Sequence, residues 1–240
     1  FSDESSSQLI SLTPYFAAAV AIMSQQMALE GLLDSYLGHQ AGKLVRSGQY
    51  RRGDGKSIDS VIWFSDLRGF TSFTDQHSVE ETLKRLNRSF DLVGKSICDH
   101  GGEILKFIGD AILAVFPVSE ERDKRAAAEA AVAAAQKAIQ SLDGEVLEGQ
   151  EPIRVGVGLH NGIVTFGNVG TTSRLDFTVI GGPVNEAARL ASMCKQLNQD
   201  ILLTDSIACL LPEYSLHDLG EHILRGVANS RRLYGVPLPL

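Results

Sequence analysis

The stretch Glu103-Ile-Leu-Lys-Phe-Ile-Gly-Asp-Ala-Ile-Leu-Ala-Val-Phe116 decides the fold. Two short runs of mostly apolar residues flank Gly109-Asp110, and two strands around such a two-residue turn are typical of a β-hairpin. A hairpin pairs its strands antiparallel, so the sheet that contains it is not the all-parallel sheet of a doubly wound fold. We therefore expect strands at 103–108 and 111–116 within a mixed sheet.

Helical and extended patterns alternate on either side of this hairpin. We expect further strands at 58–64, 153–159, 164–168, 175–180, 201–204, 214–219 and 232–236, and helices at 79–100, 121–142, 183–197 and 206–211. The sum predicts an α/β (α+β) sandwich, in which helices pack on an outer face of one mixed, mostly antiparallel sheet. Gly156-Val-Gly158 lacks the third glycine of a dinucleotide-binding fingerprint and lies within a strand, so we interpret it as a packing device.

The N-terminal part of the chain has a different pattern. Apolar residues follow helical spacing over 9–45 with interruptions at Gly38 and Gly42, and residues 47–56 hold three glycines, as a linker does. We divide the chain into a helical extension with its linker (1–55) and a second domain (56–240). No run approaches the ~20 apolar residues that cross a bilayer. An upstream sensor or membrane tether stays open, because the chain begins with Phe.

Composition argues against several classes of function. The 240 residues carry a formal net charge of −7 and no block of Lys or Arg, which disfavours a nucleic-acid partner. Cys98, Cys194 and Cys209 form no C-x-x-C pair, so we expect neither a zinc site nor a disulfide framework, and a cytoplasmic location follows. Gly53-Asp-Gly-Lys-Ser57 has only the tail of a phosphate-binding P-loop and precedes its strand, so we reject it.

Two aspartates at strand ends are the strongest candidates for chemistry. Asp66 follows the run Val61-Ile-Trp-Phe-Ser65, and Asp110 lies in the hairpin turn. Oxygen ligands suit Mg²⁺, which takes one or two carboxylates and keeps positions for phosphate oxygens. The pair can hold a cation if the two strands are neighbours, whereas Asp110 alone is equally typical of an ordinary turn.

The turn that follows Asp66 suits a phosphorylated substrate. Residues 67–72 come after a strand, contain Gly69 and lead into Thr71 and Ser72, which can cap a helix. Free N–H groups at a helix start bind anions, so a triphosphate could lie here beside a metal on Asp66. The alternative is an ordinary strand-to-helix turn.

Two further pairs of polar residues have the right chemistry for a nucleotide. Asn185 and Arg189 lie one turn apart on an expected helix, so they face the same way and could donate to ribose and phosphoryl oxygens. Lys106 and Thr178 each lie within an expected strand and could face a cleft. The alternatives are a surface ion-pair face for the first pair and half-exposed strand positions for the second.

In this order the motifs resemble the catalytic domain of class III nucleotidyl cyclases, in the bacterial adenylate cyclase form. The resemblance covers about residues 57–240 and rests on five segments, which are Phe64-Ser-Asp-Leu-Arg-Gly-Phe-Thr71, Gly102-Glu-Ile-Leu-Lys-Phe-Ile-Gly-Asp-Ala111, Gly156-Val-Gly-Leu-His-Asn-Gly162, Asp176-Phe-Thr-Val-Ile-Gly-Gly-Pro-Val-Asn-Glu-Ala-Ala-Arg-Leu190 and Leu219-Gly-Glu-His-Ile-Leu-Arg-Gly226. It implies a ferredoxin-like core and a head-to-tail homodimer with active sites at the interface.

The resemblance also implies a metal site in one protomer. Asp66 and Asp110, with the Leu67 carbonyl, would hold two Mg²⁺ (or Mn²⁺) ions per active site. The adjoining substrate contacts that it implies are Gly69, Phe70 and Thr71.

The partner protomer would complete the site. Lys106 and Thr178 would read the purine, and Asn185 and Arg189 would serve the transition state. Arg225 stands where the family usually has Lys and would meet the terminal phosphates.

Lys106 and Thr178 decide the substrate. Lysine only donates and suits adenine N1, while the threonine oxygen can accept from adenine N6. Guanylyl relatives carry Glu and Cys instead, so the resemblance implies an adenylate cyclase that makes 3′,5′-cyclic AMP and pyrophosphate from ATP in intracellular signalling. A guanylate cyclase and a catalytically silent nucleotide-binding module stay as alternatives. The general base is open, and the Thr form leaves bicarbonate regulation as a hypothesis.

Overall fold

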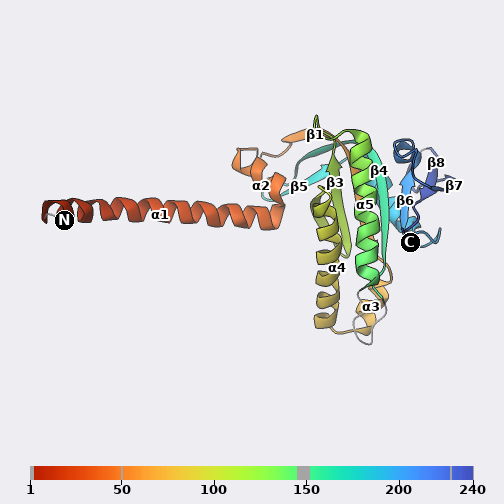
Figure 1. Cartoon of the computed structure of the whole chain (residues 1–240), viewed down its shortest axis with the longest axis horizontal. Helices are drawn as coiled ribbons and strands as arrows, with labels where there is room; N and C mark the ends of the chain where they lie inside the picture. Colours follow the sequence, from red (N-terminus) through yellow and green to blue (C-terminus); the bar gives the residue numbers. More distant parts are fainter. Residues whose placement is uncertain (1–2, 50, 145–151, 228, 240) are drawn as a thin grey trace. The chain divides into compact units, whose positions relative to one another are not determined.

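The computed structural model describes residues 3–49, 51–144, 152–227 and 229–239, and the chain forms two compact units, Phe1–Tyr50 and Arg51–Leu240. The first unit consists of helices α1 (Asp3–Leu37) and α2 (His39–Arg46) (Figure 1). They are separated by Gly38, whose φ of 83° requires glycine, and are joined by an ion pair of 2.8 Å between Arg46 and Asp34. The α1 helix begins earlier than the sequence pattern predicts.

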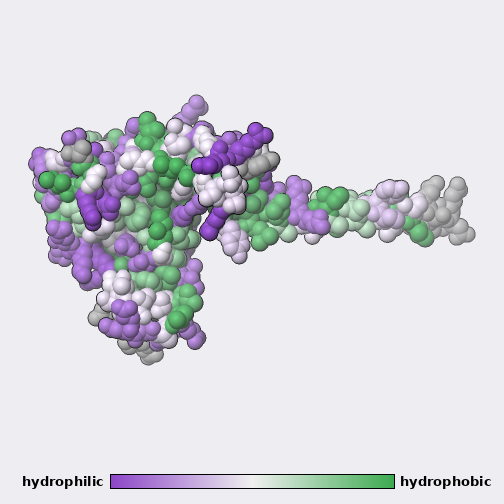
Figure 2. All heavy atoms as spheres, turned by 180° about the vertical axis from the view of Figure 1, so that it is seen from behind, coloured by the Kyte–Doolittle hydropathy of each residue, from purple (hydrophilic) through white to green (hydrophobic). Residues whose placement is uncertain are grey.

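Large apolar side chains are exposed along α1, and Figure 2 shows them as green atoms on this helix; they include Ile10, Phe16, Ile22, Met27 and Leu32. The segment Ile10–Leu37 is long and apolar enough to cross a membrane, by length and composition only. Our expectation of no such stretch was wrong, because it considered only unbroken apolar runs. Length and composition alone do not separate a membrane helix from other apolar helices.

The second unit contains one eight-stranded sheet in the order β2-β3-β1-β4-β6-β8-β7, with β5 paired to β4. The strands are β1 (Gly55–Leu67), β2 (Glu103–Ile108), β3 (Ala111–Pro117), β4 (Val155–Gly170), β5 (Leu175–Ile180), β6 (Ile201–Thr204), β7 (His217–His222) and β8 (Arg231–Gly235). Among the strand pairs of the described residues, only β4–β6 is parallel, so the predicted mixed, mostly antiparallel sheet is confirmed. The predicted hairpin is β2–β3, and Gly109 has the positive φ of 63° that its turn requires.

One long strand, β4, replaces the two strands that the sequence predicts at 153–159 and 164–168. Gly162, which lies between the two expected strands, continues β4 and allows a close approach of another residue. A Cβ atom there would lie 2.4 Å from Pro183 Cγ. The uninterrupted strand pairs with the whole length of β1, from Gly55 opposite Gly167 to Leu67 opposite Val155.

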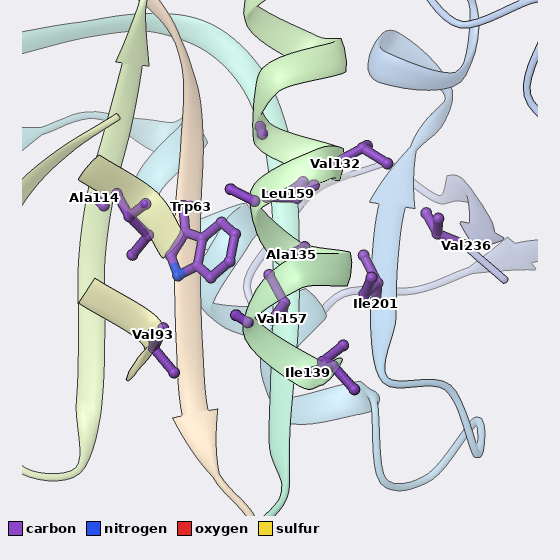
Figure 3. Packing of buried hydrophobic residues seen from close by; sticks show 14 of the residues in the cluster. Trp63, Val93, Ala114, Val132, Ala135, Ile139, Val157, Leu159, Ile201 and Val236 are labelled. Carbon is purple, nitrogen blue, oxygen red and sulfur yellow. The ribbon is translucent and has the colours of Figure 1, made fainter. Parts of the chain in front are cut away.

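Helices α4 (Val79–Asp99) and α5 (Lys124–Asp143) pack on one face of the sheet. Six of the nine buried residues of α5 are alanine, which lets the helix lie close to Trp63 of β1 and Val157 of β4 (Figure 3). Because apolar burial is the main stabilising term, this layer is the core of the unit. Two short helices, α3 (Phe70–Gln76) and α7 (Asp205–Ala208), follow β1 and β6.

Helix α6 (Gly182–Met193) covers the opposite face, a feature that the sequence prediction did not include. Gly156 and Gly158 of β4 let this helix pack closely on the sheet, since a Cβ on Gly158 would lie 2.3 Å from the Ala187 carbonyl oxygen. This confirms the two glycines as a packing device. The helix ends at Met193, before the predicted Leu197, and its fixed position determines where its polar side chains lie.

Candidate active site

Asp66 and Asp110 come together because their strands are neighbours. β1 pairs antiparallel with β3, and Asp66 lies opposite Ala111, the residue after Asp110. The two carboxyl side chains form a hydrogen bond, and both residues are half-buried. The convergence that the sequence made conditional on neighbouring strands is therefore present in one chain.

The pKa of Asp66 is raised to about 6. Burial is the main cause, followed by the charge of Asp110 and the hydrogen bond to it, while a hydrogen bond from the Leu67 backbone acts in the opposite direction. Two carboxylates held this close repel each other unless a proton or a cation lies between them. In the described residues no group of three or more His, Cys, Asp and Glu side chains could hold a metal. Mg²⁺ needs only one or two carboxylates when phosphate and water complete its shell, so the pair fits it.

The turn after β1 differs from the capping that the sequence predicts. Gly69, not Thr71 or Ser72, is the N-cap of α3, and its φ of 74° lies in the left-handed region. No side chain caps this helix start, and both hydroxyl residues lie within the helix. The turn needs the backbone freedom of glycine more than a hydroxyl. Phe70 packs against the core, and Thr71, which follows β1 and its Asp66 in the chain, is exposed.

Lys106 and Thr178 lie on the same face of the sheet. The residue that relates them is Asp176, which the sequence analysis missed. Lys106 forms an ion pair with Asp176 of β5. Side chains alternate along a strand, so Asp176 and Thr178 point to the same side, and Lys106 shares that side. The missed signal was Asp176 itself, a carboxylate two positions before the threonine and on its face. A bulge in β2 between Ile104 and Lys106 also breaks the alternation that we assumed.

Arg189, a polar residue of α6, contacts the turn after β7 that carries Arg225. Asn185 and Arg189 are exposed on α6, and Arg189 Nε donates a hydrogen bond of 3.2 Å to the Arg225 carbonyl oxygen. The Arg189 side chain thus lies against the backbone of Arg225, on the exposed side of α6 that also carries Asn185. Such a surface can bind phosphate oxygens.

Behind Asn185, a buried network that the sequence did not predict fixes α6. Glu186 accepts two hydrogen bonds from Arg231, of 2.7 and 3.1 Å, and lies 3.6 Å from His160 Nε2. His160 Nδ1 lies 2.8 Å from the Thr204 hydroxyl. Hydrogen bonding to Arg231 lowers the pKa of Glu186, and burial lowers the pKa of His160. The contacts join residues far apart in sequence, so no local pattern could reveal them.

The candidate residues thus form an acidic group at the end of β1 and a largely cationic group on β2, β5 and α6. Within the described residues, no hydrogen bond or ion pair connects Asp66 or Asp110 to any member of the second group. One group can bind a divalent cation, and the other can bind phosphate and a base. Arg189 and Lys106 are open to solvent, as expected of residues that act on a ligand or a second chain.

Comparison with known proteins identifies relatives across the second unit. The family described as the adenylate and guanylate cyclase catalytic domain matches residues 55–235. A terminal-differentiation-specific adenylate cyclase of Dictyostelium discoideum is 31% identical over 233 residues, which are 93% of this chain and 11% of that protein. An adenylate cyclase of Anabaena cylindrica is 39% identical over 151 residues, which are 61% of this chain and 30% of that protein. The chain therefore spans less than a third of the length of either relative.

Solved structures give the same match for the fold. A bacterial light-regulated adenylyl cyclase superposes with a TM-score of 0.76 at 25% identity, over 94% of this chain and 63% of the other. The guanylyl cyclase Cya2 superposes with a TM-score of 0.64 at 29% identity, over 77% of this chain and 96% of the other. Both substrate classes thus occur among proteins that are similar to this chain.

Proposed function

Because this chain belongs to the family of adenylate and guanylate cyclase catalytic domains, we propose that it converts ATP to 3′,5′-cyclic AMP and pyrophosphate. The observation that carries the choice of substrate is the common face of Lys106 and Thr178. The ammonium group would donate to adenine N1, and the threonine hydroxyl would accept from N6. Guanine presents the opposite pattern at these two positions, so this pair would bind it poorly.

Guanylate cyclase is the second candidate, and one observation favours it. Asp176 is an acceptor beside Lys106. A carboxylate could accept from guanine N1–H while the ammonium group donates to O6. The ion pair between them would have to open for either base, so the two readings differ in whether Asp176 contacts the purine.

Asp66 and Asp110 would hold two Mg²⁺ or Mn²⁺ ions, together with the Leu67 carbonyl. The support is the mutual repulsion of the two carboxylates, which a divalent cation relieves. When bound, such ions lower the pKa of a ribose hydroxyl and neutralise triphosphate charge. Gly69, Phe70 and Thr71 would hold the substrate beside them, because they follow directly from the carboxylate strand.

The reaction would be an in-line displacement at the α-phosphorus. The ribose 3′-oxygen forms the new P–O bond, the bond to pyrophosphate breaks, and the hydroxyl proton passes to a base that is either Asp66 or water. Arg189 would stabilise the charge that gathers on the phosphoryl oxygens, and Asn185 would orient the ribose. Arg225 would bind the terminal phosphates, since its backbone already contacts Arg189.

We further propose that the active form is a head-to-tail homodimer. The support is that the acidic and cationic groups have no mutual contacts in one described chain, so a second copy can bring one to the other. Each interface would then contain Asp66 and Asp110 from one protomer and Lys106, Thr178 and α6 from its partner.

The test is a metal-dependent assay with ATP and with GTP over a range of protein concentrations. We expect cyclic AMP as the main product, no product in EDTA, and a fall in specific activity on dilution as dimers separate. Cyclic GMP as the main product would support the second candidate. Activity that is independent of dilution down to nanomolar protein would contradict a site shared between protomers.

The regulatory and cellular expectations stay predictions. They are an upstream sensor segment, stimulation by bicarbonate and a cytoplasmic location of the catalytic unit. Bicarbonate is tested by adding it to the purified enzyme at fixed pH, and an unchanged rate would exclude it.

A further inference from the structure

A cleft of about 690 Å³ lies on the second unit, outside the residues assigned to the cyclase reaction except Gly69. Small-molecule sites are commonly of this size, about 300–1,000 Å³. Its lining comes from the β1–α3 turn, α3, the first turns of α4, the start of β4 and the segment after α6. The cleft therefore joins elements that are distant in sequence.

Cations dominate this lining. The charged or titratable residues among the lining residues are Arg68, His77, Arg85, Arg154 and Lys195, and none of the lining residues is an Asp or Glu. The whole chain has a net charge of −7. A surface that collects four permanently basic side chains in such a protein is a local reversal of its charge, and it attracts anions.

Two of the arginines are fixed by the fold. Arg68 pairs with Asp200 at 2.9 Å and also donates to the Gln199 carbonyl oxygen. Arg85 is only 6% exposed, and its guanidinium lies 4.4 Å from the centre of the Phe73 ring. Both are preorganised, because they need not be ordered when a ligand arrives.

The other two cations are available for a ligand. Arg154 and Lys195 are exposed, and within the described part of the chain neither side chain has a hydrogen-bond or ion-pair partner. Buried Arg85 and these two exposed cations border the same cleft. One cation of the cleft is thus held in place, and two others can reorient to bind an anion.

The aromatic side chains leave no free ring for a nucleobase. The Phe73 ring stacks on His77, with 3.8 Å between ring centres, and also lies under Arg85. His77 Nδ1 contacts the Phe73 carbonyl oxygen at 2.9 Å, which holds this stack in place. The site is therefore suited to charge rather than to base stacking.

The cleft shares Gly69 with the proposed triphosphate contacts but not Phe70 or Thr71. Gly69, Ser72, Phe73 and Gln76 line the cleft, and their three- and four-residue spacing places them on one side of the helix. Phe70 packs against the core instead, and Thr71 does not line the cleft.

We propose that this cleft binds a small anion with two or more phosphoryl groups, at a site that adjoins the cyclase centre at Gly69 and is otherwise lined by different residues. A phosphoryl group concentrates nearly two negative charges on three oxygens, which matches adjacent guanidinium forks better than a single carboxylate does. The proposal does not depend on the substrate of the enzyme. A ligand here would contact α3, which also carries the residues placed beside the substrate.

The experiment is isothermal titration of the full chain with inorganic pyrophosphate in EDTA, so that no metal can hold the anion at Asp66 and Asp110. We expect binding by the wild type and by Asp66→Asn. The double variant Arg154→Gln/Lys195→Gln should bind at least about tenfold more weakly, because hydrogen bonds to charged groups are lost. Exposed side chains are changed, so folding should be unaffected, which circular dichroism checks.

Matched controls separate this site from the cyclase centre. Lys137→Gln removes an exposed cation outside the cleft, and Arg225→Gln removes one at the proposed triphosphate site. Both should bind within about twofold of wild type, as distant sites act independently. No binding by wild type, or a loss with Arg225→Gln but not with the double variant, would overturn the proposal. Equal affinity for citrate would overturn the phosphoryl class. These binding measurements do not use cyclase activity, so a failure of the proposed function would not change their outcome.

Discussion

Two partly buried carboxylates of the same sheet unit have opposite surroundings. Asp66 faces another acid, Asp110, and its pKa is raised to about 6, whereas Glu186 is held by Arg231 and its pKa is lowered. The fold thus satisfies one acid internally and leaves the other with an unfavourable neighbour. Unfavourable electrostatics that the fold does not relieve are typical of functional sites. The contrast supports our proposal that Asp66 serves the reaction, whereas Glu186 holds α6 in position.

The largest expected effect tests the functional half of this comparison. Asp66→Ala should reduce cyclase activity by on the order of 10³-fold or more. The variant would lose a ligand for the metal ions that are proposed to neutralise the triphosphate. Its free energy of unfolding should not fall, since a repulsion is removed. Activity assays with Mg²⁺ and Mn²⁺ and urea denaturation measure the two quantities. Full activity in this variant would contradict the metal site.

The structural half predicts a loss of stability. Arg231→Met removes both hydrogen bonds to Glu186 and should cost about 2–3 kcal/mol of unfolding free energy, as a buried charge loses its partner. Arg232→Met is the matched control, because Arg232 pairs with Asp218 in an exposed position. It should change stability by less than about 1 kcal/mol. If the two variants lost equal stability in urea denaturation, the network would not be what fixes α6.

The pH dependence of stability sharpens the same contrast. Burial lowers the pKa of His160 below its unfolded value, so its stabilising contribution is complete above about pH 6.5 and is lost as pH falls through the lower folded value. The groups that face the ring are Glu186, Arg231, Asp205 and the Thr204 hydroxyl. Wild type should therefore lose stability relative to His160→Gln between about pH 7 and 5. A constant difference in melting temperature over that range would exclude this titration.

Local signals in the sequence predicted the strands of the hairpin and the order of the elements. They did not predict the long-range contacts. Gly109-Asp110 marked the hairpin turn because turn chemistry is local. The sequence also predicted two strands where β4 is continuous, and Gly162, which lies between them, allows contact with Pro183 instead of ending a strand. Glycine reports backbone freedom without saying what uses it.

The candidate site shows the same limit. The motifs pointed to Asp66 and Asp110, but whether the two carboxylates meet depends on β1 and β3 being neighbours. The contact of Glu186 with Arg231 joins residues 45 positions apart and has no local signature. Exact partners of this kind follow from strand order, which periodicity does not specify.

The smallest expected effect concerns Asp176. Its ion pair with Lys106 is exposed, so this carboxylate is neither held by a partly buried partner, as Glu186 is, nor placed beside another acid, as Asp66 is. Exposed ion pairs contribute about 0–1 kcal/mol, so Asp176→Asn should change kcat/KM for ATP by less than about fivefold. With GTP the same variant should lose at least about tenfold, because guanine N1–H loses the charged acceptor that Asp176 provides beside Lys106. Thr178→Val is the complementary control, since it removes the acceptor proposed for adenine N6 and should weaken ATP more. If Asp176→Asn instead impaired ATP turnover severely and left GTP unaffected, the assignment of adenine to this face would be wrong.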